Sequence, residues 1–296
     1  MRTAFIAIVG RPNVGKSTLM NHLLGEKVAI VSPKPQTTRN RIAGILTKGE
    51  DQYVFLDTPG VHHAKNKLGE FMMKTVRSSV GSADAVILIA EAGYPAGEIE
   101  KNLINQIKKS ELPSILVLNK IDLVNREKLA ETIANYAALH DFDAVVPTCA
   151  ETGKNVSDVL DEAEKFLYEG EWMFDEDSLT DQPERQIAAE IIREKLLRTL
   201  SDEIPHGTAV VIEQFDEDDK MIRIRAEIYC EKQSHKGIIV GKNGETLKKI
   251  GTYAREDMEA FFGTKVYLNL WVKVKEKWRD DQLSLNSFGF KPKQNM

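Results

Sequence analysis

The 296-residue sequence contains only two cysteines, Cys149 and Cys230, which lie in different halves of the chain. A disulfide framework needs more cysteines, placed closer together, so no such framework is expected. We predict that both are buried packing thiols in a protein of a reducing compartment, the cytoplasm.

Long hydrophobic runs are also missing. The longest apolar stretches, Ala4–Val9 and Ala85–Ala90, are far shorter than the roughly 20 residues that a membrane-spanning helix requires. Because Met1 leads through the first stretch directly into a glycine-rich loop, we expect no cleavable signal. The sequence has no internal repeat or low-complexity tract and only 10 prolines, which favours a soluble globular protein.

The length favours two domains, each with its own core. The net charge is −5, yet residues 228–279 hold eleven Lys or Arg against six Asp or Glu. A basic module attached to an acidic enzyme is therefore expected. The acidic, irregular stretch before Pro183 indicates the boundary. We expect one domain over 1–170, a linker over 171–183, a second domain over 184–280 and a tail over 281–296.

In the first domain, short apolar runs alternate with helix-like segments. This pattern predicts an α/β fold with a mostly parallel sheet covered on both faces. The predicted strands are Phe5–Val9, Tyr53–Leu56, Val86–Ala90, Ile115–Leu118 and Ala144–Pro147. The motifs described next follow the carboxyl ends of such strands, where ligands bind in open α/β sheets.

The segment GRPNVGKS, Gly10–Ser17, fits the pattern GxxxxGKS of a phosphate-binding loop. Backbone N–H groups of such a loop surround phosphate oxygens, Lys16 reaches the β and γ phosphates, and Ser17 faces Mg²⁺. A glycine turn that caps a helix would be the plain alternative. Here the loop lies between a buried strand and a predicted helix, whose amino terminus favours an anion.

The segment NKID, Asn119–Asp122, identifies the base. The Asp122 carboxylate only accepts hydrogen bonds, and guanine presents two adjacent donors that adenine lacks. A site built around such a hydrogen bond rejects the wrong ligand by on the order of 10⁴-fold. We therefore predict GTP and GDP as ligands rather than ATP.

Two further segments predict nucleotide-dependent switches. In DTPG, Asp57–Gly60, the aspartate would hold Mg²⁺ through water and the Gly60 amide would sense the γ-phosphate. In the segment PQTTR, a threonine hydroxyl would join the Mg²⁺ shell. Thr37 and Thr38 both remain candidates, and Thr38 is favoured.

Catalysis is less evident. Val61 follows DTPG and cannot orient a water, and we interpret Arg39 and Arg41 as solvated loop residues rather than arginine fingers. Hydrolysis would then depend on Lys16, Mg²⁺ and backbone dipoles, with a further contribution from outside, so we expect a slow intrinsic rate. The segment Thr148–Gly153 resembles the fifth loop of such enzymes, in which a backbone amide meets the guanine O6. Cys149 replaces the usual serine and is a weaker donor, so contact with the base must rest on main-chain N–H groups.

The second domain begins with a predicted helix over Glu184–Ile204, which Pro205–Gly207 ends. The later elements are predicted as strands Thr208–Gln214 and Met221–Glu231 with the turn DEDDK between them, a helix ending near Val240, a helix Glu245–Phe262 and a strand Lys265–Lys275. The turn Gly241-Lys242-Asn243-Gly244 joins the two later helices. This is the GxxG arrangement of a KH domain, in which glycines let the backbone approach nucleic-acid phosphates and lysines supply charge.

Along nearly its full length the chain resembles the Era GTPases, which join a Ras-like GTPase domain to a type II KH domain. The resemblance rests on GRPNVGKST, PQTTRNR, DTPGVH, NKID, TDQPER, EIIREKLL, EIPH, HKGIIVGKNGETLKKIG, AREDME and VYLNLWVKVKEKWRDD. It implies a protein that binds the 3′ end of small-subunit (16S) ribosomal RNA, contacts the small ribosomal subunit and assists its maturation. It also implies peripheral association with the inner membrane face. We expect a monomer.

The site residues follow from these motifs. The predicted nucleotide-binding residues are Gly10, Arg11, Pro12, Asn13, Val14, Gly15, Lys16, Ser17, Thr18, Asp57, Thr58, Pro59, Gly60, Asn119, Lys120, Asp122, Cys149 and Ala150. The predicted metal ligands are Ser17, Thr38 and Asp57, and the predicted catalytic residues are Lys16, Asn13 and Thr38. Resemblance to potassium-activated relatives implies that Asn13 helps to hold K⁺. The predicted RNA-binding residues are Lys236, Gly241, Lys242, Asn243, Gly244, Lys248 and Lys249.

A second function from another class stays open at this point. The chain would then be a signalling GTPase whose second domain binds a protein or membrane partner. The lysines around the GxxG turn favour RNA over this alternative.

Overall fold

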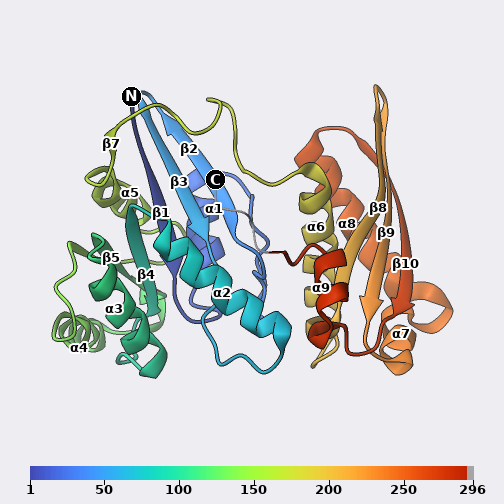
Figure 1. Ribbon diagram of the computed structural model, residues 1–296, viewed down its shortest axis with the longest axis horizontal. Coiled ribbons are helices and arrows are strands. Elements are labelled where there is room, and N and C mark those ends of the chain that lie inside the picture. The colour runs from blue at the N-terminus through green and yellow to red at the C-terminus, as the bar shows by residue number, and fades with distance from the viewer. Residues whose placement is uncertain (292–296) are drawn as a thin grey trace. The chain divides into compact units, whose positions relative to one another are not determined.

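The computed structural model describes residues 1–291. The chain divides into two compact units, and the larger part of the second, from Gln182 onward, is coloured from yellow to red in Figure 1. The N-terminal unit comprises Met1–Ala64 and Gly69–Asp181, and the C-terminal unit comprises Lys65–Leu68 and the residues from Gln182 onward. The last five residues of the predicted tail lie outside the described residues.

The N-terminal unit is built on one mixed, mostly parallel sheet in the order β2-β3-β1-β4-β5-β6, with β7 paired to β1. The strands are β1 Arg2–Val9, β2 Ile42–Lys48, β3 Asp51–Asp57, β4 Ala85–Glu91, β5 Ser114–Asn119, β6 Ala144–Pro147 and β7 Tyr168–Glu169. Strands β1, β3, β4, β5 and β6 are mutually parallel, and β2 and β7 run antiparallel to their partners. The five predicted strands and the parallel sheet are thereby confirmed.

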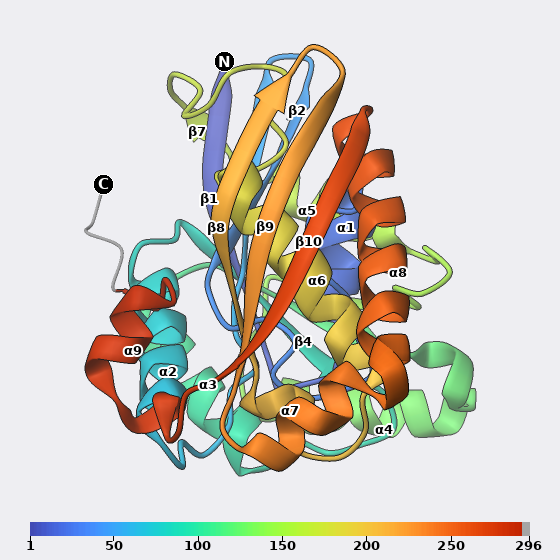
Figure 2. The ribbon, with the colours of Figure 1, turned by 90° about the vertical axis from the view of Figure 1, so that its right-hand side faces the viewer.

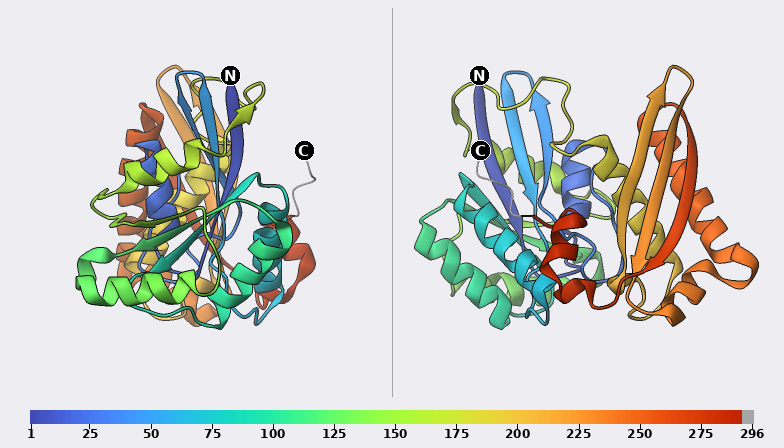
Figure 3. Two further views of the ribbon diagram at one scale, coloured as in Figure 1. Left: turned by 90° about the vertical axis from the view of Figure 1, so that its left-hand side faces the viewer. Right: turned by 45° about the vertical axis from the view of Figure 1, so that its right-hand side comes forward.

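Helices cover both faces of this sheet, as Figures 1 and 3 show. They are α1 Lys16–Leu24, α2 Lys67–Gly81, α3 Glu98–Ser110, α4 Arg126–Ala137 and α5 Val156–Glu164, with a short 3₁₀ turn, η1, at Ile121–Leu123. Ile6 and Ile8 of β1 pack on the side of α1 and α5, and Ala7 and Val9 pack on the side of α2 and α3. Burial on both faces explains why these strands are continuously apolar.

Strand β2 was not expected from the sequence. Its run of apolar residues is short and is interrupted by Gly44, which weakens a strand pattern. A Cβ at Gly44 would lie 2.6 Å from Leu24 Cδ1 and 2.9 Å from Met20 Sδ. The glycine therefore lets α1 approach the sheet closely.

The segment that we expected to form a linker is hydrogen bonded to the N-terminal unit over residues 172–181. The Ile45 N–H donates to Leu179 O at 2.9 Å, and the Ala43 N–H donates to Asp181 Oδ1 at 3.1 Å. Gln52 of β3, which is fully buried, accepts from the N–H groups of Met173 and Phe174. These contacts cover part of the outer edge of β2.

The C-terminal unit packs helices on one face of a three-stranded sheet of order β10-β9-β8. Its elements are α6 Glu184–Thr199, β8 Ala209–Asp218, β9 Met221–Cys230, α7 Gln233–Val240, α8 Glu245–Phe262, β10 Lys265–Val274 and α9 Gln282–Ser287, with 3₁₀ turns η2 Pro205–Gly207, η3 Lys242–Gly244 and η4 Trp278–Asp280. Strand β9 is antiparallel to β8 and parallel to β10. The core joins α6, α7 and α8 to the inward residues of β9 and β10.

Two predicted boundaries in this unit were wrong. Helix α6 ends at Thr199 instead of Ile204, because Leu200 already has extended backbone angles. Strand β8 continues to Asp218, so only Asp219 and Lys220 form the turn that we expected over DEDDK. The strand tolerates these acids because Asp216 and Asp218 are exposed.

Both cysteines are buried free thiols, as predicted. Over residues 1–291, none of the helices combines the length and the apolar composition of a membrane span.

Candidate functional site

The glycine-rich loop connects the carboxyl end of β1 to α1. Gly15 has φ +105°, and a Cβ there would lie 2.2 Å from Asn119 Nδ2, so only glycine fits. Lys16 is 6% exposed, and its Nζ donates to Gly10 O at 3.2 Å and to Arg11 O at 2.7 Å. Burial lowers the pKa of Lys16 to about 8, and the charge of Asp57 opposes this shift. A buried ammonium that bonds only carbonyl oxygens is suited to receive an anion.

Three hydroxyl and carboxylate groups meet beside Lys16. Ser17 Oγ donates to Asp57 Oδ2 at 2.6 Å, Thr38 Oγ1 donates to the same oxygen at 3.0 Å, and the two hydroxyl oxygens lie 3.0 Å apart. The Thr37 hydroxyl instead donates to Lys34 O at 2.7 Å. The sequence favours Thr38 without excluding Thr37, and of the two it is Thr38 that lies beside Ser17 and Asp57 in this structure.

Asp57 is fully buried, and its Oδ1 has no hydrogen-bond partner among the described residues. Burial raises the pKa of Asp57, while the charge of Lys16 and the hydroxyl hydrogen bonds act against this rise. A buried carboxylate oxygen without a donor fits a hard cation such as Mg²⁺, which prefers oxygen ligands. The side-chain oxygens beside Asp57 are the hydroxyls of Ser17 and Thr38, and within residues 1–291 no three His, Cys, Asp or Glu side chains cluster for a metal.

The DTPG segment leaves β3 and lies against the glycine-rich loop. Thr58, Pro59 and Gly60 are buried, and Thr58 Oγ1 donates to Ile8 O at 2.7 Å. A Cβ at Gly60 would lie 2.7 Å from the backbone of Pro12. Gly60 therefore has to be a glycine for this segment to approach the loop.

Other residues of the loop are held from outside it. Asn13 is exposed, has φ +63° and donates through Nδ2 to Pro33 O at 2.8 Å. Val14 is buried, and Thr18 lies half-buried in the first turn of α1. Arg11 forms an ion pair with Glu100 of α3, whose side chain is almost completely buried.

Glu100 was not expected from the sequence to belong to the site. The Gly97 N–H donates to Glu100 Oε2 at 3.0 Å, so the same side chain caps the amino terminus of α3. A glutamate at the third position of a predicted helix is one half of a capping box, and this is the sequence signal that could have indicated the cap. Glu100 thus joins the glycine-rich loop to α3.

Asn119 ties together the loops at the other end of the site. Its Nδ2 donates to Val14 O at 2.7 Å, and its Oδ1 accepts from the Ala150 N–H at 2.8 Å. Lys120 has φ +65°, and its Nζ donates to Glu91 Oε2 at 3.0 Å. Asp122 lies exposed on η1. The motif thus combines a buried cross-link at Asn119 with an exposed carboxylate at Asp122.

Backbone N–H groups of the loop after β6 hold this loop in place. The buried Cys149 donates its N–H to Lys154 O at 3.1 Å, and the Ala150 N–H is bonded to Asn119 as described. We expected main-chain N–H groups of this loop to reach a base. In this structure, the N–H groups of Cys149 and Ala150 hold the loop to its neighbours.

The prediction that Arg39 and Arg41 are solvated was wrong for Arg39, which is 2% exposed. The preceding residue, Thr38, is buried where its hydroxyl bonds Asp57, and Arg39 is buried next to it in the chain. Arg41 is half-buried, and its guanidinium lies 3.8 Å from the Asp181 carboxylate.

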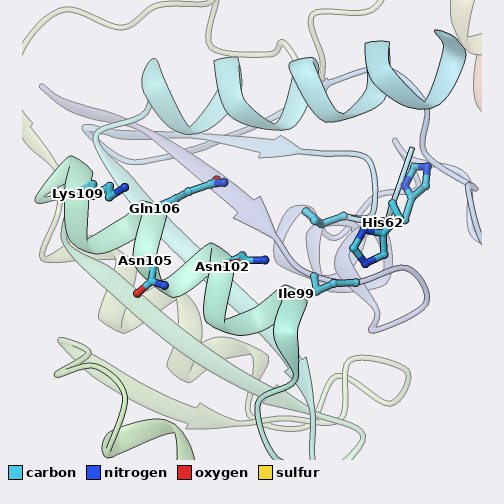
Figure 4. A pocket seen from close by; sticks show the side chains of 8 residues that line it. His62, Ile99, Asn102, Asn105, Gln106 and Lys109 are labelled. Carbon is cyan, nitrogen blue, oxygen red and sulfur yellow. The ribbon is translucent and has the colours of Figure 1, made fainter. Parts of the chain in front are cut away.

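A polar cavity of about 400 Å³ lies beside the segment that follows DTPG (Figure 4). Its walls are one face of α3 and the residues after Gly60. It is lined by Val61, His62, His63, Ile99, Asn102, Asn105, Gln106 and Lys109. None of the predicted nucleotide residues lines it, so it is separate from the phosphate loop.

The GxxG turn lies between α7 and α8. Gly241 has φ +75°, and a Cβ there would lie 2.2 Å from Thr246 Oγ1 and 2.9 Å from the Thr246 backbone nitrogen. Asn243 has φ +53° and is exposed, as is Lys242. Gly244 has φ +81° and precedes α8. The turn therefore presents its two central side chains and its backbone to solvent.

The other predicted lysines flank this turn. Lys248 and Lys249 are exposed on the first turns of α8, and Lys236 is half-buried on α7. Two apolar residues of the same helices that were not expected at this surface, Ile238 and Tyr253, are 50% and 45% exposed. Lys249 Nζ lies 5.8 Å from the centre of the Tyr253 ring. Only their exposure, which no sequence pattern reports, distinguishes these two residues from core positions.

Comparison with known proteins agrees with this geometry. A family model described as a 50S ribosome-binding GTPase matches residues 5–120, and one described as a KH domain matches residues 203–279. The expected P-loop GTPase fold followed by a KH domain is thereby confirmed.

Relatives match the full chain. GTPase Era of Ruminiclostridium cellulolyticum is 47% identical over 99% of both proteins, and GTPase Era of Clostridium kluyveri is 48% identical over 98% of this chain and 100% of that protein. A crystal structure of Era with MgGDPNP and nucleotides 1506–1542 of 16S ribosomal RNA has a TM-score of 0.94 at 38% identity, covering 98% of this chain and 99% of that one. A variant of Aquifex aeolicus Era bound to GDP·AlF₄⁻ also has a TM-score of 0.94, at 39% identity and with the same coverage. Since the similarity extends over both units, the chain belongs to the Era family of GTPases.

Proposed function

We propose that this chain is a GTP-hydrolysing switch that binds the 3′ end of 16S ribosomal RNA and assists assembly of the small ribosomal subunit. The observation that carries the proposal is the likeness, over 98% of the chain, to an Era crystallised with both MgGDPNP and a 16S rRNA fragment. We assign nucleotide hydrolysis to residues 1–170 and RNA binding to residues 184–280, with 171–183 joining them.

The phosphates would lie against the glycine-rich loop. Lys16 exchanges its carbonyl partners for phosphate oxygens, and the amino terminus of α1 presents further N–H groups. Because Lys16 is buried, its charge acts on the phosphates with little screening by water.

Ser17, Thr38 and Asp57 are the residues that would hold Mg²⁺, since their oxygens already lie within hydrogen-bond distance of one another. Mg²⁺ neutralises phosphate charge as it develops during hydrolysis. Thr38 belongs to the loop before β2, so its hydroxyl links the position of that loop to the occupant of the site. Thr37 is bonded elsewhere and is not needed for this link.

Asp122 would select guanine by accepting hydrogen bonds from its two adjacent donors. Its carboxylate is exposed in this structure, and a bound base would cover it. Asn119 positions this end of the site by bonding the loops that carry Val14 and Ala150. Lys120 is held against Glu91 and supports the same strand end.

Hydrolysis would be slow, because Val61 offers no polar group to orient water. Asn13 is the proposed contact for K⁺: its Nδ2 is used by Pro33, and its Oδ1 is the atom type that binds a cation. A monovalent cation at this position would add positive charge beside the phosphates, in place of the glutamine that the chain lacks after DTPG.

The RNA would bind at the GxxG turn. Phosphates approach the backbone at Gly241 and Gly244, and Lys236, Lys242, Lys248 and Lys249 supply positive charge. The exposed apolar groups of Ile238 and Tyr253 offer surfaces for unstacked bases. The protein would act as a cytoplasmic monomer, with peripheral contact to the inner face of the membrane.

The decisive experiment changes the charge of the turn without touching the nucleotide site. The variant Lys242→Asp with Asn243→Asp should lose about 10-fold or more of its affinity for a 16S 3′-terminal RNA, with GTP affinity unchanged. Lys101→Asp with Asn102→Asp is the matched control, since both residues are exposed on α3 and the charge change is identical. Unchanged RNA binding by the first variant would reject RNA recognition at this turn and favour a signalling GTPase.

A further inference from the structure

The sheet of the C-terminal unit has one face that α6 and α8 do not cover, and Figure 2 looks onto this face. Residues of β9 and β10 alternate between the core and this outer face. Ile222, Ile224, Val266 and Val272 point to the core and are buried. The intervening positions therefore form the outer surface.

Two large aromatic side chains lie on this outer face of β10. Tyr267 and Trp271 are each 58% exposed. Tyr267 is paired in register with Arg223 of β9, and Asn269 is paired with Arg225, and both arginines are exposed. We call Tyr267, Trp271, Arg223 and Arg225 the outer strip.

The part of the tail that the structure describes contacts one end of this face. Phe288 contacts Tyr229 with ring centres 4.5 Å apart, and Trp278, which is fully buried, contacts Phe288. Tyr229 is paired with Lys273, two positions beyond Trp271. The outer strip itself remains exposed, although tryptophan and tyrosine normally bury most of their area.

We propose that the outer strip is a second RNA-binding surface, on which unpaired bases of the bound RNA stack against Tyr267 and Trp271. This inference rests on the proposed RNA-binding function and adds a surface beyond the GxxG turn. A GxxG groove clamps about four nucleotides, so the rest of a longer RNA lies outside it.

The spacing of the rings fits separate bases. Tyr267 and Trp271 are four residues apart on one strand, which places their Cα atoms about 13 Å apart. One base cannot cover both rings, so each ring takes its own base. Asn269 lies between them on the same face, where its amide can bond the edge of a base.

The charge of β9 and β10 complements a phosphate backbone. Their outward positions include Arg223, Arg225, Lys265 and Lys273 against one acid, Glu227. Arg223 forms an ion pair with Asp218, and Lys273 forms an ion pair with Glu227. The outward acids Asp216 and Asp218 lie on β8, so an RNA would follow β10 and the near side of β9 rather than cross to β8.

The test measures affinity of the full chain for a 16S 3′-terminal RNA with the double variant Tyr267→Ala, Trp271→Ala. Because both side chains are exposed, the fold should persist. Loss of two stacked bases should weaken binding by about 10-fold or more. Tyr267→Phe with Trp271→Phe keeps two aromatic faces and should retain most of the affinity. Tyr94→Ala is the matched control, because Tyr94 is 57% exposed in the N-terminal unit.

Tryptophan fluorescence gives a second readout. RNA should quench the emission of the wild type, and Trp271→Phe should remove this quenching, since Trp278 is buried and the half-buried Trp172 belongs to the N-terminal unit. If the alanine variant binds the RNA as tightly as the wild type, the outer strip is not an RNA surface, and a protein partner becomes its better occupant. If the wild type itself binds no RNA, the proposed function fails instead.

Discussion

Single side chains at the nucleotide site carry unfavourable electrostatics. Asp57 is fully buried with one oxygen that has no donor among the described residues, and burial alone raises its pKa. Lys16 is buried with only carbonyl oxygens as hydrogen-bond partners, and burial lowers its pKa to about 8. Both charges are disfavoured by burial until a phosphate and a cation compensate them. Burial of these two charges therefore lowers the stability of the protein without ligand and strengthens the binding of a ligand that compensates them.

Base selection should depend on Asp122. In Asp122→Asn the carboxylate becomes an amide that no longer accepts from both guanine donors, so GTP affinity should fall by about 10- to 100-fold. Xanthosine triphosphate, which offers an acceptor where guanine has its amine, should bind the variant better than the wild type. Titration of both nucleotides by calorimetry checks this exchange. Equal GTP affinity of the wild type and the variant would remove Asp122 from base recognition.

The two adjacent threonines should behave differently. Thr38→Ala removes a hydroxyl that lies 3.0 Å from both Ser17 Oγ and Asp57 Oδ2, so the single-turnover rate of GTP hydrolysis should fall by about 10-fold or more. Thr37→Ala, the matched control, should keep the wild-type rate, because its hydroxyl bonds Lys34 O. Hydrolysis measured against Mg²⁺ concentration tests the pair. A larger loss of hydrolysis rate in Thr37→Ala than in Thr38→Ala would mean that Thr37, and not Thr38, meets the metal.

Helices and strands were predictable where local pattern and burial agree. The runs that became β1, β4 and β5 are apolar throughout because helices cover both faces of the sheet. Strand β2 was not predicted because Gly44 meets α1, and this tertiary contact leaves no trace in a period-two pattern. Helix α6 was predicted too long, because its end is set by the extended backbone of Leu200 rather than by the later proline.

The residues of the candidate site were likewise predictable where they depend on local sequence and not where they depend on tertiary contacts. Sequence motifs specify which residues meet the phosphates, because loop length and residue type are local properties. Glu100 was missed, since its contact with Arg11 joins elements far apart in the chain. Arg39 was misjudged, because a polar sequence does not reveal that the preceding threonine draws it inward.

One such tertiary contact should determine whether the segment after α5 stays ordered. Gln52 holds Phe174 through both amide atoms and also bonds Met173, with all distances between 2.9 and 3.1 Å. Gln52→Ala leaves these backbone groups without partners, so the free energy of unfolding should fall by about 2–3 kcal/mol. Gln106→Ala, an exposed position of the same unit, should change it by less than about 0.5 kcal/mol.

Urea unfolding and hydrogen exchange over residues 172–181 measure this effect. The Gln52 variant should exchange these amides faster than the Gln106 variant. Equal stability and equal exchange in the two variants would mean that Gln52 does not anchor the segment.

At the scale of the whole molecule, opposite charges are divided along the chain. Residues 228–279 carry a net charge of +5 within a chain of net charge −5. An acidic remainder repels RNA, so phosphate contacts should concentrate on the basic segment. Residues 1–170, with 20 Lys or Arg and 21 Asp or Glu, are close to neutral, so the acidic excess lies outside the predicted GTPase domain.

The most direct test of the account is the affinity of the intact chain for a fluorescently labelled 16S 3′-terminal RNA, measured by anisotropy with GDPNP and then with GDP. A GTP-operated RNA switch predicts tight binding with Mg²⁺ and GDPNP and clearly weaker binding with GDP. Equal affinity in the two nucleotide states would contradict the switch, and absence of binding in both would contradict RNA recognition itself.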